Sequence, residues 1–131
     1  MNNKKIICLL LLYFISNCVL AITPGKWQGT FTNSKDKRYK IHYVVTRDCD
    51  AEVTKTSIRM VNIDLEPTPD YTYQLQKIKV DNGALSFDIP RKFDTRSCEL
   101  SEQEDKSYIG SCLSDKGEKN QTSHITMKPI E

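Results

Sequence analysis

The chain has few of the side chains that usually carry out catalysis. It contains only two histidines, His42 and His124, and no Gly-x-Ser-x-Gly turn of the kind that exposes a nucleophilic serine. A histidine-activated nucleophile needs an imidazole that faces a pocket beside a serine or cysteine. Both histidines alternate with apolar neighbours, which places them on outward strand faces. We therefore expect no catalytic residue and a protein that is not an enzyme.

Spacings typical of metal sites are also missing. No Cys-x-x-Cys pair occurs, and two histidines are too few for the usual zinc patterns. Asp48, Asp50 and Glu52 alternate around Cys49 and would point the same way in an extended chain. They could hold calcium weakly or act as an acid pair on a glycoside, but calcium loops use glycine turns and more oxygen ligands. A charged strand edge is the simpler interpretation, so we expect no metal and no cofactor.

No apolar run is long enough to cross a bilayer, which takes about 20 residues. The run Ile6–Ile15 follows Lys4 and Lys5 and precedes a small residue, Ala21. A positive start, an apolar middle and a small-residue exit are the three parts of a secretory signal peptide. The pattern predicts cleavage after Ala21 and a secreted or periplasmic protein without a membrane-spanning segment.

Cys18 permits a second interpretation, a lipoprotein that is cleaved just before this cysteine. Ile15-Ser16-Asn17-Cys18 departs from a bacterial lipobox because Asn17 stands where a small residue is expected. Plain secretion therefore fits the signal better. We expect residues 1–21 to be removed as a signal peptide and residues 22–131 to form a single β domain.

The excess of positive charge disappears with the signal. The whole chain has 19 basic and 17 acidic residues, and the two signal lysines leave 17 of each in residues 22–131. A neutral domain offers no electrostatic basis for binding nucleic acid or an anionic membrane. The basic stretch from Lys35 to Lys40 and the acidic stretch from Glu99 to Asp105 are interpreted as solvated loops of opposite sign.

What the domain does contain is short segments in which apolar and polar residues alternate, and none keeps a helical period. Such alternation places one face of a strand on a core and the other in water. The strand candidates are Lys26–Thr32, Tyr39–Val45, Val53–Leu65, Tyr71–Val80, Leu85–Ile89, Cys98–Leu100, Tyr108–Leu113 and Ile125–Met127.

The connections between these segments predict a sheet that curls. Asp81-Asn82-Gly83 is the strongest turn signal, because Asn-Gly readily adopts positive φ. The alternation changes phase within Val53–Leu65 and again within Tyr71–Val80, which predicts a bulge or bend in each. The pattern favours an all-β fold, a small antiparallel meander closed into a barrel of about eight strands, with a β-sandwich as the alternative.

The segment Gly25-Lys26-Trp27-Gln28-Gly29 opens the first strand candidate. It resembles the Gly-x-Trp start of lipocalin-like and avidin-like barrels. In those families the tryptophan closes one barrel end and a basic residue of the last strand packs across it. The resemblance implies a structural role for Trp27, with Phe31 on the same strand face, and it assigns the basic position to Lys128.

Three cysteines remain in the domain, and the thiols of an exported protein are normally oxidised in its compartment. Cys98 and Cys112 flank the acidic loop on neighbouring strand candidates, so a hairpin would hold them side by side. We predict a Cys98–Cys112 disulfide and an unpaired Cys49. Asn120 begins a glycosylation sequon, which matters only if the producing cell glycosylates secreted proteins.

Two functions from different classes remain open. The size, signal and Gly-x-Trp start are similar to small exported barrels that inhibit bacterial metalloproteases, although the cysteine placement differs. Such inhibitors block a cleft with a loop or a chain terminus and need no catalytic residues. Alternatively, the nine aromatic residues of the domain could line a barrel that carries a small apolar ligand. We expect a non-enzymatic binding protein, and place a protein partner ahead of an apolar ligand.

Overall fold

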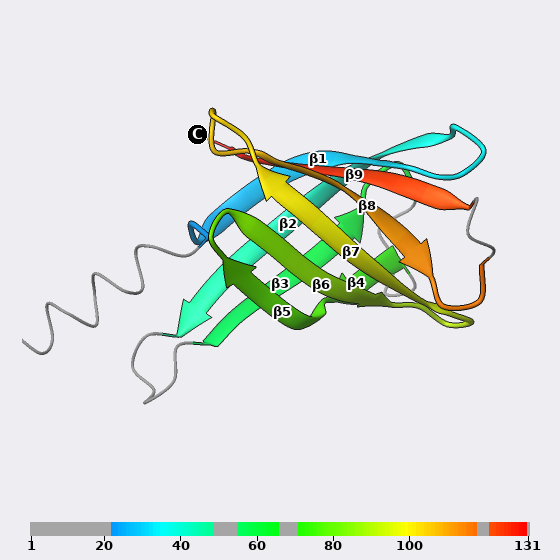
Figure 1. Ribbon diagram of the computed structural model, residues 1–131, viewed down its shortest axis with the longest axis horizontal. Coiled ribbons are helices and arrows are strands. Elements are labelled where there is room, and N and C mark those ends of the chain that lie inside the picture. Colours follow the sequence, from blue (N-terminus) through cyan, green and yellow to red (C-terminus); the bar gives the residue numbers. More distant parts are fainter. Residues whose placement is uncertain (1–21, 49–54, 66–70, 118–120, 131) are drawn as a thin grey trace, which may run out of the picture.

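The computed structural model describes residues 22–48, 55–65, 71–117 and 121–130 (Figure 1). The predicted signal peptide lies outside these residues, as do Cys49, Asp50, Glu52 and Asn120. The described part is all β-structure. Its strands are β1 (Gly25–Thr32), β2 (Arg38–Asp48), β3 (Lys55–Asn62), β4 (Thr72–Gln74), β5 (Gln76–Asp81), β6 (Ala84–Pro90), β7 (Thr95–Glu102), β8 (Tyr108–Ser114) and β9 (Thr122–Pro129).

All the strands belong to one antiparallel sheet in the order β4-β3-β2-β1-β9-β8-β7-β6-β5. The first strand lies between β2 and the last strand, so the two ends of the domain join within the sheet (Figure 1). The sheet thereby curls into a nearly closed barrel, and β4 and β5 form its edges. The predicted antiparallel barrel is confirmed, and the sandwich alternative is wrong.

The alternation of the sequence decides which side chains fill the barrel. Leu85, Phe87 and Ile89 of β6 are buried, while Ser86 and Asp88 between them are only half-buried. The same alternation in β1, β2, β3 and β9 supplies most of the remaining core. Each apolar side chain that leaves water in this way contributes about 1.5–3 kcal/mol to stability.

Two glycines allow strands to approach more closely than any side chain would permit. A Cβ on Gly29 would lie 1.8 Å from the carbonyl oxygen of Thr126, and one on Gly110 would lie 1.9 Å from that of Glu99. Both glycines have the inward parity of their strands, where a curling sheet is most crowded. The close approach of β1 to β9 and of β8 to β7 therefore depends on the missing side chains.

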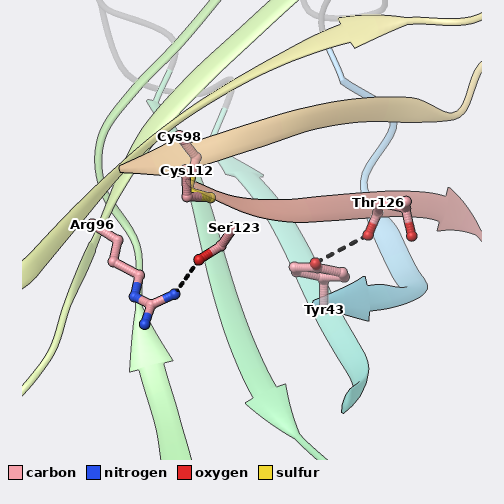
Figure 2. The surroundings of a disulfide bond; sticks show 6 residues. All are labelled: Tyr43, Arg96, Cys98, Cys112, Ser123 and Thr126. Carbon is pink, nitrogen blue, oxygen red and sulfur yellow. Dashed lines mark hydrogen bonds between the residues drawn. A yellow bond between two sulfur atoms is a disulfide. The ribbon is translucent and has the colours of Figure 1, made fainter. Parts of the chain in front are cut away.

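Side chains complete the junction between β1 and β9, where the regular pairing has a gap between Gln28 and Phe31 although the register is the same on both sides. The Thr30 amide donates to Oγ1 of Thr126 over 2.9 Å. The hydroxyl of buried Tyr43 donates to the Thr126 carbonyl oxygen over 3.1 Å (Figure 2). Burial raises the pKa of Tyr43, so its phenol stays protonated and remains a donor.

The predicted bend within Tyr71–Val80 is confirmed. Leu75 is buried and separates β4 from β5, and the register of β5 against β6 shifts between Gln76 and Lys79. Lys77 adopts a positive φ of 52° at this bulge. The predicted Asn-Gly turn is also confirmed, because Asn82 and Gly83 have φ values of 47° and 78° between β5 and β6.

The second predicted bend, within Val53–Leu65, does not lie inside the strand, and the chain bends only after it, at residues 63–65. The pairing of β2 with β3 runs without a shift from Ile41–Asn62 to Asp48–Lys55. The strand ends at Asn62, so Ile63 and Leu65 belong to the segment that follows it and their phase is unrelated to that of the strand. In the sequence, a change of alternation at the end of a strand looks the same as one caused by a bulge inside it. Only the position at which the strand ends distinguishes the two.

The predicted disulfide is present. Cys98 of β7 lies directly opposite Cys112 of β8, and their sulfur atoms are bonded in the barrel core (Figure 2). The bond closes a sequence separation of 14 residues. In the chain-entropy model a loop of this length stabilises the fold by about 3 kcal/mol.

One end of the barrel is closed by Trp27, which is 2% exposed. Its indole N–H donates to the Thr23 carbonyl oxygen over 2.8 Å, and its ring centre lies 6.0 Å from that of Tyr108. The resemblance implied that Lys128 packs across this ring, and that is wrong. Lys128 is exposed and pairs with Gln28 on the outer face, whereas Tyr108 makes the contact with Trp27.

Replacing Trp27 by alanine is expected to lower the free energy of unfolding by about 3–5 kcal/mol, because it empties the closed end of the barrel. His42→Ala and His124→Ala are the controls, since both side chains are exposed and should change stability by less than about 0.5 kcal/mol. Urea denaturation of the three variants provides the measurement. A Trp27→Ala variant as stable as either control would refute a structural role for Trp27.

Gly29→Ala and Gly110→Ala should each destabilise the barrel by roughly 3 kcal/mol or more, since the added methyl meets backbone rather than a movable side chain. Gly117→Ala is the matched control, because its nearest neighbours are the side chains of Gln121 and Ser114. Thermal unfolding compares the three variants. Equal melting temperatures would show that the close approach of the strands at Gly29 and Gly110 is not required.

Candidate ligand pocket at the open end of the barrel

The barrel end opposite Trp27 is hollow. A pocket of about 240 Å³ lies where β1 ends and β2 begins, and it reaches between β3, β4, β6 and β7. Ile41, Met60 and Ile89 form a buried apolar floor. The rings around them belong to Phe31, Tyr39, Tyr71 and Tyr73. The two barrel ends therefore differ, since one is filled by an aromatic side chain and the other is lined by several.

The alternation of each strand explains why these side chains meet. Phe31 shares the inward face of β1 with Trp27, four residues earlier. Tyr39 lies opposite Phe31 in the register of β1 with β2, and Tyr73 lies opposite Met60 in that of β3 with β4. Tyr39 and Tyr73 are half-buried, so the apolar part of each ring faces the cavity while part of the side chain meets solvent. The pocket thus has an apolar floor and a phenolic rim.

Arg96 of β7 enters the pocket from the inward side of its strand. Its Nη1 donates to the buried hydroxyl of Ser123 over 2.6 Å (Figure 2). Its guanidinium carbon lies 4.8 Å from the ring centre of Phe31, a cation–π geometry. Its Nε is buried and has no hydrogen-bond acceptor in the described part of the chain. Burial, followed by the charge of Arg91, lowers the pKa of Arg96.

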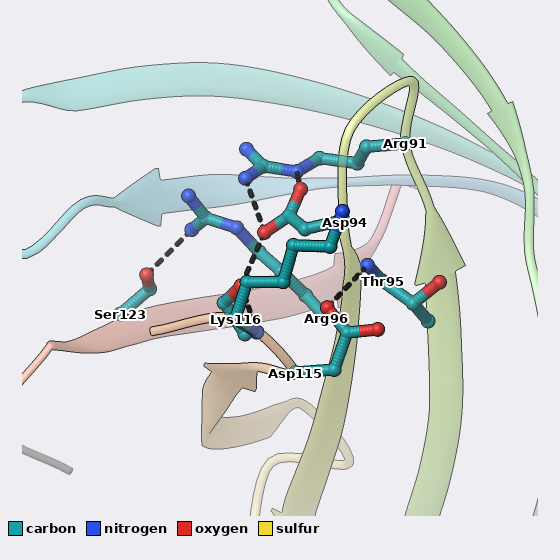
Figure 3. Close-up of polar contacts among 8 residues, drawn as sticks. Arg91, Asp94, Thr95, Arg96, Asp115, Lys116 and Ser123 are labelled. Atoms are coloured by element: carbon teal, nitrogen blue, oxygen red, sulfur yellow. Dashed lines mark hydrogen bonds and ion pairs between the residues drawn. The ribbon is translucent and has the colours of Figure 1, made fainter. Parts of the chain in front are cut away.

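A second arginine lies at the same rim but is neutralised. Arg91 donates from Nε and Nη2 to the two carboxylate oxygens of Asp94 over 2.6 and 2.7 Å (Figure 3). The Ser114 hydroxyl also donates to Asp94. The hydrogen bond from Arg91 is the main reason why the pKa of Asp94 is lowered, so this carboxylate stays charged.

Arg96 has no such partner. The ion pairs within the described residues join Lys77 to Asp88, Arg91 to Asp94 and Lys106 to Glu102. Figure 3 shows the Arg91 and Arg96 guanidinium groups pointing in the same direction, with Asp94 held by Arg91. The pocket therefore carries one positive charge that no carboxylate of the described chain neutralises by direct contact.

The basic stretch predicted as a solvated loop borders this pocket. Asn33 lines the cavity, and its side-chain oxygen accepts hydrogen bonds from the amides of Lys35 and Lys37. The ammonium of Lys37 lies 5.3 Å from the centre of the Tyr39 ring. The loop is exposed as predicted, but it also adds positive potential beside the rim.

Sequence reasoning placed Phe31 inside the barrel but missed the pocket and Arg96. One signal for Arg96 was available, since it shares its parity with Cys98 and Leu100, both of which are buried. An arginine on the apolar parity of a strand is uncommon, because burying its charge is costly without partners. Nothing in the sequence indicated that Ser123 would supply one of those partners from β9.

The remaining predicted sites stay apart from the pocket. His42 and His124 are exposed on the outer face. Asp48 ends β2 and is exposed, while the other two carboxylates of that trio lie outside the described residues. Within the residues that the structure describes, no three His, Cys, Asp or Glu side chains gather as a metal site would require. The described part also has no helix of a length and apolarity that would span a membrane.

Comparison with family models, with curated proteins and with solved structures finds no match for this chain. The geometry of the pocket is therefore the basis on which a function can be inferred.

Ser123→Ala should lower the free energy of unfolding by about 1.5–3 kcal/mol, because it leaves a half-buried guanidinium without its acceptor. Ser97→Ala is the matched control, since this serine lies in β7 beside Arg96 but is exposed. Chemical denaturation of both variants tests the expectation. A Ser123→Ala protein as stable as the control would mean that water replaces this hydroxyl at no cost.

Proposed function

We propose that this chain is an exported, non-enzymatic binding protein that holds a small molecule in the pocket at the open end of its barrel. The pocket itself is the observation that supports this function. Its buried apolar floor and aromatic rim are typical of small-molecule sites, which often occupy the mouths of β-barrels. The resemblance of the Gly-x-Trp start to lipocalin-like barrels agrees with this proposal.

The dimensions of the pocket limit what it can hold. Sites for drug-sized ligands usually have about 300–1,000 Å³, and this cavity has about 240 Å³. A molecule with a single ring fits such a volume, whereas a long lipid chain does not. The core below the pocket is filled by the barrel's own side chains, so the ligand would remain at the mouth.

Export is supported by the disulfide in the core. Disulfides form and persist in oxidising compartments and are rare in the cytosol. If cleavage follows Ala21, the new first residue is Ile22, which is 1% exposed. The Arg47 guanidinium donates to the Ile22 carbonyl oxygen, so the new terminus would be attached to the closed end of the barrel. These features favour a secreted or periplasmic location.

A protein partner is the second candidate function, and a groove on the outer face favours it. This groove has about 440 Å³ and crosses the outer faces of β2, β1, β9 and β8. Ile63 and Ile109 line it and are 40% and 51% exposed. Exposed apolar side chains that cluster in this way mark many protein interfaces. An inhibitor of the kind that the sequence resembles would use such a surface without catalytic groups.

Native mass spectrometry of protein purified from its own secretory compartment should show a chain that begins at Ile22 and retains a small-molecule mass. Tyr39→Ala removes a ring of the rim and should weaken retention up to about tenfold. Phe93→Ala is the control, because its ring is 75% exposed and lies outside the pocket.

Two other results would contradict the proposal. A stoichiometric protein complex that is lost in Ile109→Asp but kept in Tyr39→Ala would make the protein-binding function the correct one. A lipid-modified chain that begins at Cys18 would overturn the assignment to a soluble exported protein.

A further inference from the structure

We propose that the ligand of this pocket is a small aromatic carboxylate, whose ring lies among the rim tyrosines and whose carboxylate is bound by Arg96. This inference rests on the proposed function and adds the chemical class of the ligand to it.

The charges around the pocket favour an anion. The lining residues include Arg91 and Arg96 but no aspartate or glutamate. Asp94 is the carboxylate beside them, and Arg91 and Ser114 already occupy both of its oxygens. A ligand with one negative charge would bring the pocket to neutrality. A neutral ligand would leave the Arg96 charge partly desolvated, with Asp94 acting on it but forming no direct ion pair, which is costly.

The guanidinium of Arg96 is prepared for such a ligand. Ser123 fixes one end of it and the Phe31 ring supports its face, so little side-chain freedom remains to be lost on binding. A guanidinium offers five N–H donors, and Nε has no acceptor among the described residues. A planar carboxylate accepts two parallel hydrogen bonds from this kind of donor fork.

The rest of the pocket favours a particular kind of group next to the carboxylate of the ligand. Phe31, Tyr39, Tyr71 and Tyr73 present ring surfaces, and the floor is aliphatic. Aromatic rings in offset or tilted arrangements attract one another by more than the burial of their area provides. An inorganic anion would satisfy Arg96 but would leave these rings in contact with water. The combination therefore favours an anion attached to a flat ring.

The experiment uses the mature domain, residues 22–131, with benzoate, benzamide, acetate and inorganic phosphate as probes. Amide shifts in heteronuclear NMR locate each probe and give its affinity. Benzoate should shift the amides of Tyr39, Tyr73 and Ile89 and should bind at least tenfold more tightly than each of the other three. Benzamide keeps the ring without the charge, whereas acetate and phosphate keep the charge without the ring.

Variants test the role of Arg96 itself. Arg96→Gln should remove the preference for benzoate over benzamide, and Arg96→Lys should restore only part of it, because a lysine lacks the planar fork. Arg59→Gln is the matched control, since Arg59 is exposed on the outer face of β3. If Arg96→Gln does not fold, the wild type still decides the question. Benzoate must then shift the side-chain Nε resonance of Arg96 and leave that of Arg59 unchanged.

The possible failures can be told apart. Equal binding of benzoate and benzamide at the rim would overturn the anionic class and leave the proposed function intact. Binding of acetate or phosphate as tight as that of benzoate would reduce the site to a simple anion site and overturn the aromatic class. If a set of single-ring fragments, both charged and neutral, shifts none of the rim amides, the proposed function fails together with this inference.

Discussion

The close approach of β1 to β9 at Gly29 and Thr126 is the constraint on which the rest of the barrel depends. It joins the first strand of the domain to the last, and without it the strands would form two separate antiparallel sheets with two further edges. The absence of a Cβ at Gly29 allows the approach. The hydroxyls of Tyr43 and Thr126 then supply hydrogen bonds where the regular ladder is interrupted. The buried backbone at the junction is thereby satisfied without regular pairing.

The two ends of the barrel differ in the side chains that occupy them. At the end where β1 begins, Trp27 and Tyr108 fill the interior, and the segment at Thr23 folds back to accept the indole hydrogen bond. At the other end the inward positions hold Phe31 and Tyr39, which stand at the rim and leave a cavity between them. The polar residues that follow β1, from Asn33 to Lys37, border this cavity but do not fill it. One end therefore contributes stability, and the other is available to a ligand.

Arg96 is the residue at which the proposed function and stability are in conflict. An apolar side chain at this inward position would avoid the desolvation that lowers the pKa of Arg96. Two contacts partly offset this desolvation: Ser123 accepts a hydrogen bond from the guanidinium, and the Phe31 ring packs against it. Positions where a fold departs from its own binary pattern are often functional sites. This departure coincides with the cavity, which is why the proposed ligand class is built around Arg96.

The sequence by itself determined the features that depend on neighbouring residues. Alternation assigned the inward faces of Trp27–Phe31 and Leu85–Ile89, because a pleated strand turns each successive side chain by half a revolution. The Asn82-Gly83 turn followed from the positive φ values that these residues tolerate. The Cys98–Cys112 bond followed from a hairpin of two adjacent strands. All three are local, so short-range chemistry was sufficient to predict them.

Only the tertiary structure decided what happens between strands that are distant in sequence. In the folded barrel Tyr108 contacts Trp27, and Lys128 is exposed on the outer face. The family resemblance had implied the opposite for Lys128. The pocket combines β1 with β3 and β7, and Arg96, which lines it, donates to Ser123, 27 residues further along the chain. The identity of such neighbours depends on how far the sheet curls before it closes. A change of alternation can mark a bend such as the one at Leu75, but it does not give the extent of that curvature.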